Sequence, residues 1–142
     1  MMDNLKNPAA SLLAKTLNRY HLDIPSCTSP LDVEHFSGEE AMSQTYRYAI
    51  TFTSPDKNLD ATRLLSKPVT LTMGSGVLQG LTCRKVVHGV VTRFERTGGS
   101  ADQATYAITL EPFLSLLNKQ FRTHRFFVNK SVPEVVAQIL DE

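Results

Sequence analysis

The side chains in this sequence that could hold a metal ion or act as nucleophiles are few and widely spaced. They are His21, His35, His88, His124, Cys27 and Cys83. Metal sites and nucleophilic sites are often marked by short sequence motifs such as HxH, HExxH or CxxC, and none of these motifs occurs here. A metal site could still be assembled in the folded chain from His21, His35 or His88 together with a cysteine, but the sequence gives this hypothesis no support. We predict no metal, no cofactor and no catalytic residue.

The two cysteines also bear on the compartment in which the protein folds. Two are too few for a disulfide framework, and Cys27 and Cys83 form no recognised local motif. We interpret both as free thiols in a reducing compartment.

Two other motifs could be taken for chemical sites. Glu34 with Glu39–Glu40 could form an acid–base pair, but the preceding Ser37–Gly38 is typical of a turn, so a solvated turn is favoured. Gly74-Ser75-Gly76 lacks the lysine and the following helix of a phosphate-binding loop. Neither motif predicts a reaction.

A stretch near the C-terminus interleaves basic and aromatic residues, a pattern that can bind single-stranded nucleic acid on a strand surface. Its members are Lys119, Phe121, Arg122, Arg125, Phe126, Phe127 and Lys130. The net charge of the whole chain is only +1, so we predict no nucleic-acid partner.

The charge is divided unevenly along the chain. Residues 1–60 carry five Lys/Arg and eight Asp/Glu, a net −3, whereas residues 61–142 carry ten and six, a net +4. Faces of opposite sign suit docking against a partner or another copy of the chain. An ordinary solvated surface would have the same composition.

Period-two alternation dominates the elements that must position these side chains. Tyr46, Tyr48, Ile50 and Phe52 fall on one face of an extended strand and would scatter around a helix. The expected strands are 20–24, 31–37, 44–54, 69–73, 83–96, 104–110 and 121–128.

The strand at 83–96 breaks this alternation. Val86, Val87, Val90 and Val91 would occupy both of its faces, and Gly89 lies between them. A bend or bulge at the glycine explains this pattern best. Alternatively, core covers one face and a neighbouring subunit the other.

Helices are expected to be short. A weak helix is possible at 8–18, one or two turns follow Asp60 over 61–66, and a short apolar turn or helix lies at 113–117. The best-marked helix follows Ser131, whose spacing to Glu134 is that of a capping box. Two acids at its end oppose the helix dipole, so we expect the natural protein to continue beyond residue 142.

Together these elements predict a mainly β fold with short helices, a bent antiparallel β-barrel. The expected organisation is an N-terminal arm or helix at 1–19, a first barrel at 20–128, and a helix at 129–142 that begins a further segment. The N-terminus resembles no signal peptide, and no stretch approaches the about 20 apolar residues of a membrane helix. No stable membrane association is expected.

Several stretches, taken in order, resemble a known family. LDVEHFSGEEAMSQTYRYAITFTSPDKNLD, LLSKPVTLTM, VVHGVVTRFER, YAITLEPFLSLLNKQFRTHRFF and NKSVPEVVAQIL are similar to the N-terminal region of the VgrG spike proteins of type VI secretion systems. The resemblance covers about residues 20–142. Its most specific pieces are 36–40, 88–91 and 130–134.

The resemblance implies a structural part of the phage tail-hub and tube type. Three chains would associate, and their barrels would form a ring that stacks on the hexameric Hcp tube. Tip or effector proteins would be joined through C-terminal regions absent from this sequence. The protein would assemble in the cytoplasm and leave through the secretion machinery without a signal peptide. Such a region carries no active site.

Two alternatives remain open at this point. A contractile phage tail or baseplate hub would share the fold, and neighbouring genes would separate it from a secretion spike. A β-barrel module that binds sugar or nucleic acid is a different class, and it predicts a concave aromatic patch. No tryptophan is present, and most tyrosines and phenylalanines fall at core-facing positions. A hydrolase lacks any nucleophile–base arrangement.

Overall fold

The computed structural model describes residues 20–74, 85–120 and 124–141. Its strands are β1 (Tyr20–Asp23), β2 (Asp32–Glu39), β3 (Arg47–Ser54), β4 (Pro68–Met73), β5 (Lys85–Gly99) and β6 (Ala104–Glu111). They form one six-stranded sheet in the order β1-β4-β5-β6-β3-β2, and every neighbouring pair is antiparallel.

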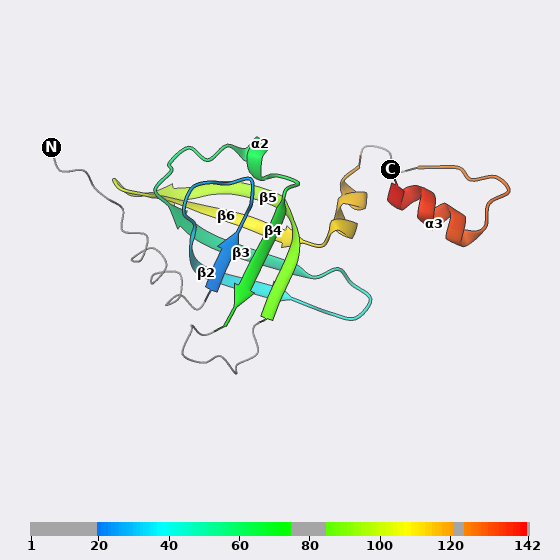
Figure 1. Ribbon diagram of the computed structural model, residues 1–142, viewed down its shortest axis with the longest axis horizontal. Helices are drawn as coiled ribbons and strands as arrows, with labels where there is room; N and C mark the ends of the chain where they lie inside the picture. The colour runs from blue at the N-terminus through cyan, green and yellow to red at the C-terminus, as the bar shows by residue number, and fades with distance from the viewer. Residues whose placement is uncertain (1–19, 75–84, 121–123, 142) are drawn as a thin grey trace.

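The sheet curls until its two edge strands, β1 and β2, approach one another (Figure 1). These two strands are not hydrogen-bonded neighbours, so the barrel is nearly closed. The expected mainly β, bent antiparallel barrel is confirmed.

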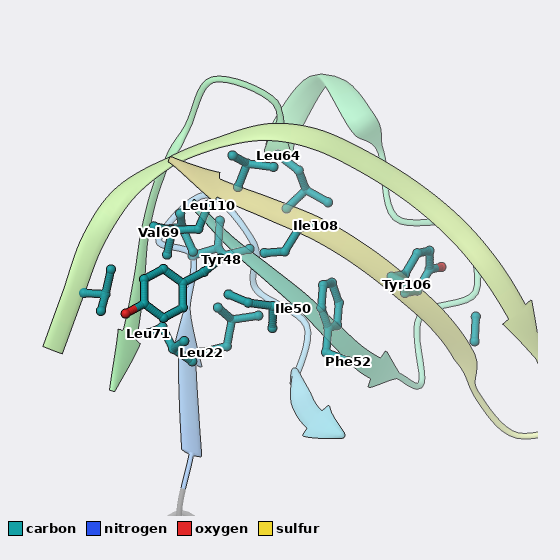
Figure 2. Packing of buried hydrophobic residues seen from close by; sticks show 14 residues of the cluster. Leu22, Tyr48, Ile50, Phe52, Leu64, Val69, Leu71, Tyr106, Ile108 and Leu110 are labelled. Atoms are coloured by element: carbon teal, nitrogen blue, oxygen red, sulfur yellow. The ribbon is translucent and has the colours of Figure 1, made fainter. Parts of the chain in front are cut away.

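Alternating residues of the strands fill the barrel, as the sequence pattern predicts. Tyr48, Ile50 and Phe52 of β3 are buried beside Tyr106, Ile108 and Leu110 of β6, and β1 and β4 add apolar residues from the other wall (Figure 2). The Phe52 and Tyr106 rings stack with centroids 5.7 Å apart. Tyr106 also donates a hydrogen bond to the Asp56 carbonyl oxygen, at 2.7 Å.

β5 makes the bend that closes the barrel. It pairs with β4 from Lys85 to Val90 and with β6 from Val90 to Gly99, and it arches across the core in Figure 2. A register shift between Val91 and Arg93 marks a bulge just after the bend. The expected bend is therefore confirmed. Val87, Val90 and Val91 are buried within this single chain, whereas Val86 is 45% exposed.

Among the described residues, three short helices accompany the barrel: α2 (Ala61–Leu64), the 3₁₀ helix η2 (Phe113–Lys119) and α3 (Val132–Asp141). Asp60 caps α2 by accepting a hydrogen bond from the Thr62 amide at 2.9 Å. α2 is shorter than the expected 61–66, because Leu65 already takes an extended conformation with φ −62° and ψ 136°. Its Leu64 is buried in the core, whereas Leu65 is 39% exposed.

The expected strand at 121–128 is wrong for the residues that the structure describes, since 124–128 form no strand. Residues 121–123 and the possible helix at 8–18 lie outside the described residues. The connection expected at 37–40 is also wrong. β2 continues to Glu39, and the loop occupies residues 40–46. Gly38 lets the strand pass over the Tyr48 ring there, because a Cβ on Gly38 would lie 2.2 Å from that ring.

Candidate interaction surfaces

The histidines do not come together in the described part of the chain. His35 and His88 each lie beside a threonine hydroxyl on the outside of the barrel, with Nε2 of His35 3.4 Å from Thr51 and Nδ1 of His88 3.1 Å from Thr70. His21 and His124 are exposed on other elements. Among the described residues, no group of three His, Cys, Asp or Glu side chains is placed to hold a metal ion.

Cys27 is a half-buried free thiol near the α2 end of the barrel. Its sulfur lies 3.9 Å from the Ser29 carbonyl oxygen, which makes it a weak local donor. Cys83 lies outside the described residues, as do Ser75 and Gly76 of the glycine motif.

The carboxylates at the end of β2 separate into different environments. Glu34 and Glu39 are exposed, whereas Glu40 pairs with Lys85 at 2.7 Å and accepts a hydrogen bond from the Tyr48 hydroxyl. The hydrogen bond from Lys85, followed by that from Tyr48, lowers the pKa of the Glu40 carboxyl. Glu40 therefore fastens the β2–β3 loop to the start of β5, an arrangement that the sequence pattern did not reveal.

A second contact holds the same loop. The Tyr46 hydroxyl donates to the His88 carbonyl oxygen of β5, and the Tyr46 and Tyr48 rings meet edge to face with centroids 6.4 Å apart. Burial, followed by the bond to Glu40, raises the pKa of the Tyr48 hydroxyl.

The loop next to this cluster borders an open hollow of about 820 Å³. It is lined by Gly38, Glu39, Glu40, Ala41, Gln44, Thr45, Arg47 and Asn118.

Aromatic side chains bridge the seam between the edge strands. The Tyr20 ring of β1 meets the Phe36 ring of β2 edge to face, with centroids 5.0 Å apart and an interplanar angle of 78°. Phe36 lies 6.3 Å from Tyr48 in turn. Side-chain packing thus completes the barrel where backbone hydrogen bonds do not.

A buried carboxylate lies where the barrel ends and the C-terminal segment begins. Glu111 is the last residue of β6, and its Oε1 accepts a bond from Arg47 Nε of β3 at 3.0 Å. Lys119 Nζ at the end of η2 lies 4.0 Å from its Oε2. Burial acts to raise the pKa of the Glu111 carboxyl, but the neighbouring polar and charged groups, Arg47 among them, outweigh it and lower that pKa.

The C-terminal segment extends away from the barrel and exposes apolar side chains (Figure 1). Phe126 is 95% exposed and Val128 77%. α3 buries none of its residues, and Val132, Val136 and Leu140 all lie open on it. Of the basic residues expected here, Lys119 pairs with Glu111 and Lys130 bonds to Gln138, while Arg122 lies outside the described residues. They do not form the strand surface that we expected.

Glu134 anchors the start of α3. Its Oε2 accepts bonds from the Ser131 amide at 2.7 Å and from the Ser131 hydroxyl at 2.8 Å, so the acidic partner of the expected capping box reaches back as predicted. These bonds lower the pKa of the Glu134 carboxyl.

None of the helices in the described part of the chain has the length and apolar character needed to cross a membrane.

Comparison with known families decides among the possible kinds of barrel. The sequence profile of the phage tail baseplate hub family (GPD) matches residues 39–142, from the end of β2 through α3. The chain belongs to this family. The matched range includes β3 to β6 of the barrel and the exposed C-terminal segment.

Spike proteins of type VI secretion systems are relatives of the chain. It is 31% identical over 118 residues to VgrG1a of Pseudomonas aeruginosa, a match that covers 83% of this chain and 18% of the relative. VgrG5 of the same organism is 32% identical over 123 residues, covering 86% and 14%. The resemblance to VgrG spike proteins is confirmed, and the chain spans less than a fifth of the length of these relatives.

A solved structure supports the same relationship. The E. coli c3393 protein matches with a TM-score of 0.68 and 34% identity, over 86% of this chain and 32% of that protein. It is a component of the type VI secretion system and exhibits structural similarity to the T4 bacteriophage tail proteins gp27 and gp5. The hub-type barrel therefore agrees in sequence and in fold.

Proposed function

We propose that this chain is the hub barrel of a type VI secretion spike, a structural part that trimerises and joins the Hcp tube to the puncturing tip. The family match, which runs from the end of β2 through β3 to β6 and α3, carries the proposal. The relatives are spike proteins of type VI secretion systems, which supports a spike component and not an enzyme. Force would pass through the packed barrel, whose core is continuous from β1 to β6.

The exposed C-terminal segment supports a larger assembly. Val132, Val136 and Leu140 follow one another at intervals of four residues, so they share one face of α3. A helix with an unburied apolar face contributes little stability by itself. We propose that residues 20–128 serve as the first barrel unit and that α3 begins the next segment of a longer spike protein. Tip or effector proteins would attach through that longer protein.

The proposed location follows from the proposed role. The spike would assemble in the cytoplasm beside the Hcp tube and leave with it through the secretion machinery. Neither the barrel nor α3 offers a helix of membrane-spanning length among the described residues. A contractile phage tail hub is the second candidate, favoured by the family to which the chain belongs.

Light scattering of the purified chain across a concentration series, alone and with Hcp hexamer rings, tests the proposal. We expect a trimer, or co-elution with the rings, because either requires an assembly surface within these residues. A chain that ends after Gln120 is the matched comparison, since it keeps the barrel and η2 and lacks the exposed segment. Repeating the measurement with phage tube protein in place of Hcp separates the two candidates. A monomer that binds neither tube protein would contradict the proposal for this region.

A further inference from the structure

The carboxylate of Glu111, at the end of β6, contacts charged side chains of β3 and η2. Arg47 from β3 donates to Oε1 at 3.0 Å across 64 residues of chain. Lys119 Nζ, at the end of η2, lies 4.0 Å from Oε2 of the same carboxylate. The Glu111 side chain is only 5% exposed, so these partners replace the water that a carboxylate otherwise needs.

η2 begins two residues after this carboxylate and ends beside it. Pro112 turns the chain, Phe113 begins the 3₁₀ helix, and Lys119 at its end returns to the Glu111 side chain. Ser115, midway along η2, is buried. η2 therefore lies against the barrel, with packing at its middle and an ion pair at its end.

The backbone at Glu111 is fitted as closely as its side chain. A Cβ on Gly89 of β5 would lie 2.4 Å from the Glu111 carbonyl oxygen, so only glycine allows this approach. Val90 then pairs with Glu111 at the point where β5 passes from β4 to β6. The same residue thus fixes the bend of the barrel and the start of η2.

We propose that Glu111 is a clamp that holds η2 against the barrel and thereby fixes the direction in which the chain leaves it. Arg47 anchors the carboxylate to the barrel wall, and Lys119 ties the far end of η2 to that anchor. Glu111 is a positioning residue and not a catalytic one. Its consequence for a spike, a rigid connection between the barrel and the next segment, rests on the proposed function, whereas the clamp itself does not.

Amide hydrogen exchange measured by mass spectrometry on the 142-residue chain tests the clamp. Glu111→Gln removes the charge and keeps the side-chain shape. We expect amides in residues 113–120 to exchange about tenfold faster or more, because hydrogen bonds to charged groups are the stronger ones. Amides of β3 and β6 should keep most of their protection. Glu95→Gln, in an exposed pair with Arg93, is the matched control and should change nothing in η2.

Further variants distinguish a local clamp from general loss of stability. Lys119→Met touches only the half-exposed end of the clamp, so it should loosen η2 even where Glu111→Gln unfolds the barrel. Arg47→Lys should retain more η2 protection than Arg47→Met. Exchange in 113–120 that stays unchanged in Glu111→Gln and Lys119→Met would overturn the clamp. So would a uniform increase across every strand in both variants. Tube binding, measured separately, could fail with the clamp intact.

Discussion

Single residues decide whether this barrel can bend. Gly89 is the clearest case, because the Glu111 carbonyl oxygen and the Leu110 side chain occupy the space that a Cβ would need. The requirement is one of close approach and not of backbone conformation. A methyl group must therefore push β5 away from β6 at the corner.

Gly89→Ala should lower the free energy of unfolding by about 1–3 kcal/mol, the usual cost of overpacking. Urea denaturation followed by far-UV circular dichroism measures it. Gly98→Ala is the matched control, because Gly98 lies on the same strand as Gly89 and a Cβ there would meet no atom within 4 Å. Equal stability of the two variants would contradict the close packing assigned to Gly89.

The Glu111 carboxyl should make stability depend on pH. Its pKa in the folded chain lies below the ordinary value, so it contributes stability above its unfolded pKa and loses that contribution as the pH falls through its folded pKa. Urea titrations between about pH 7 and about pH 3 should show a steeper loss of stability in the wild type than in Glu111→Gln. Parallel curves for the two proteins would refute this assignment, and Glu95→Gln should follow the wild type.

At the scale of elements, the barrel depends on a seam that backbone bonds do not close. β1 has only four residues, and the edge-to-face contact of Tyr20 with Phe36 joins it to β2. The adjoining Gly38–Tyr48 contact and the Glu40–Lys85 pair hold the end of β2 in place. Side-chain contacts therefore join β1 to β2, where the two strands are not paired by backbone hydrogen bonds.

Phe36→Ala should destabilise the fold by about 1–3 kcal/mol, because it removes a half-buried ring and two aromatic contacts. Thermal unfolding measures the change. The neighbouring Ser37→Ala alters an exposed side chain and should stay within about 0.5 kcal/mol of the wild type. If both variants melt together with the wild type, the seam is not held by these rings.

α3 offers the opposite expectation. It buries none of its residues and packs against no strand over an extended area. Ending the chain after Gln120 should shift the melting temperature of the barrel by less than about 2 °C. Differential scanning calorimetry provides the measurement, and a fall of more than about 5 °C would show that the C-terminal segment supports the barrel after all.

At the scale of the whole molecule, a stable core and an uncovered C-terminal segment lie within one family unit. The barrel buries its apolar residues internally, while Phe126, Val128 and the α3 stripe remain exposed. Exposed apolar side chains of this kind are typical of a protein–protein interaction surface. The chain spans 32% of the solved relative and less than a fifth of the spike proteins, which agrees with this division.

The sequence by itself determined the local elements and the face that each one buries. Period-two alternation predicted the buried residues of β3 and β6, and Ser131 with Glu134 predicted the start of α3. Both signals depend on neighbours a few residues apart, so a single sequence can carry them. The family could also be identified, because short motifs in a fixed order persist when most residues change.

Only the tertiary structure decided how remote residues meet. Arg47 and Glu111 are 64 residues apart, and Glu40 meets Lys85 only because β2 and β5 converge at one end of the barrel. The residues at 124–128 were expected to form a strand but form none, because a strand needs pairing with a neighbour and these residues pair with no described strand. Pairing between distant segments has no local period, and the folded barrel alone brings these contacts into existence.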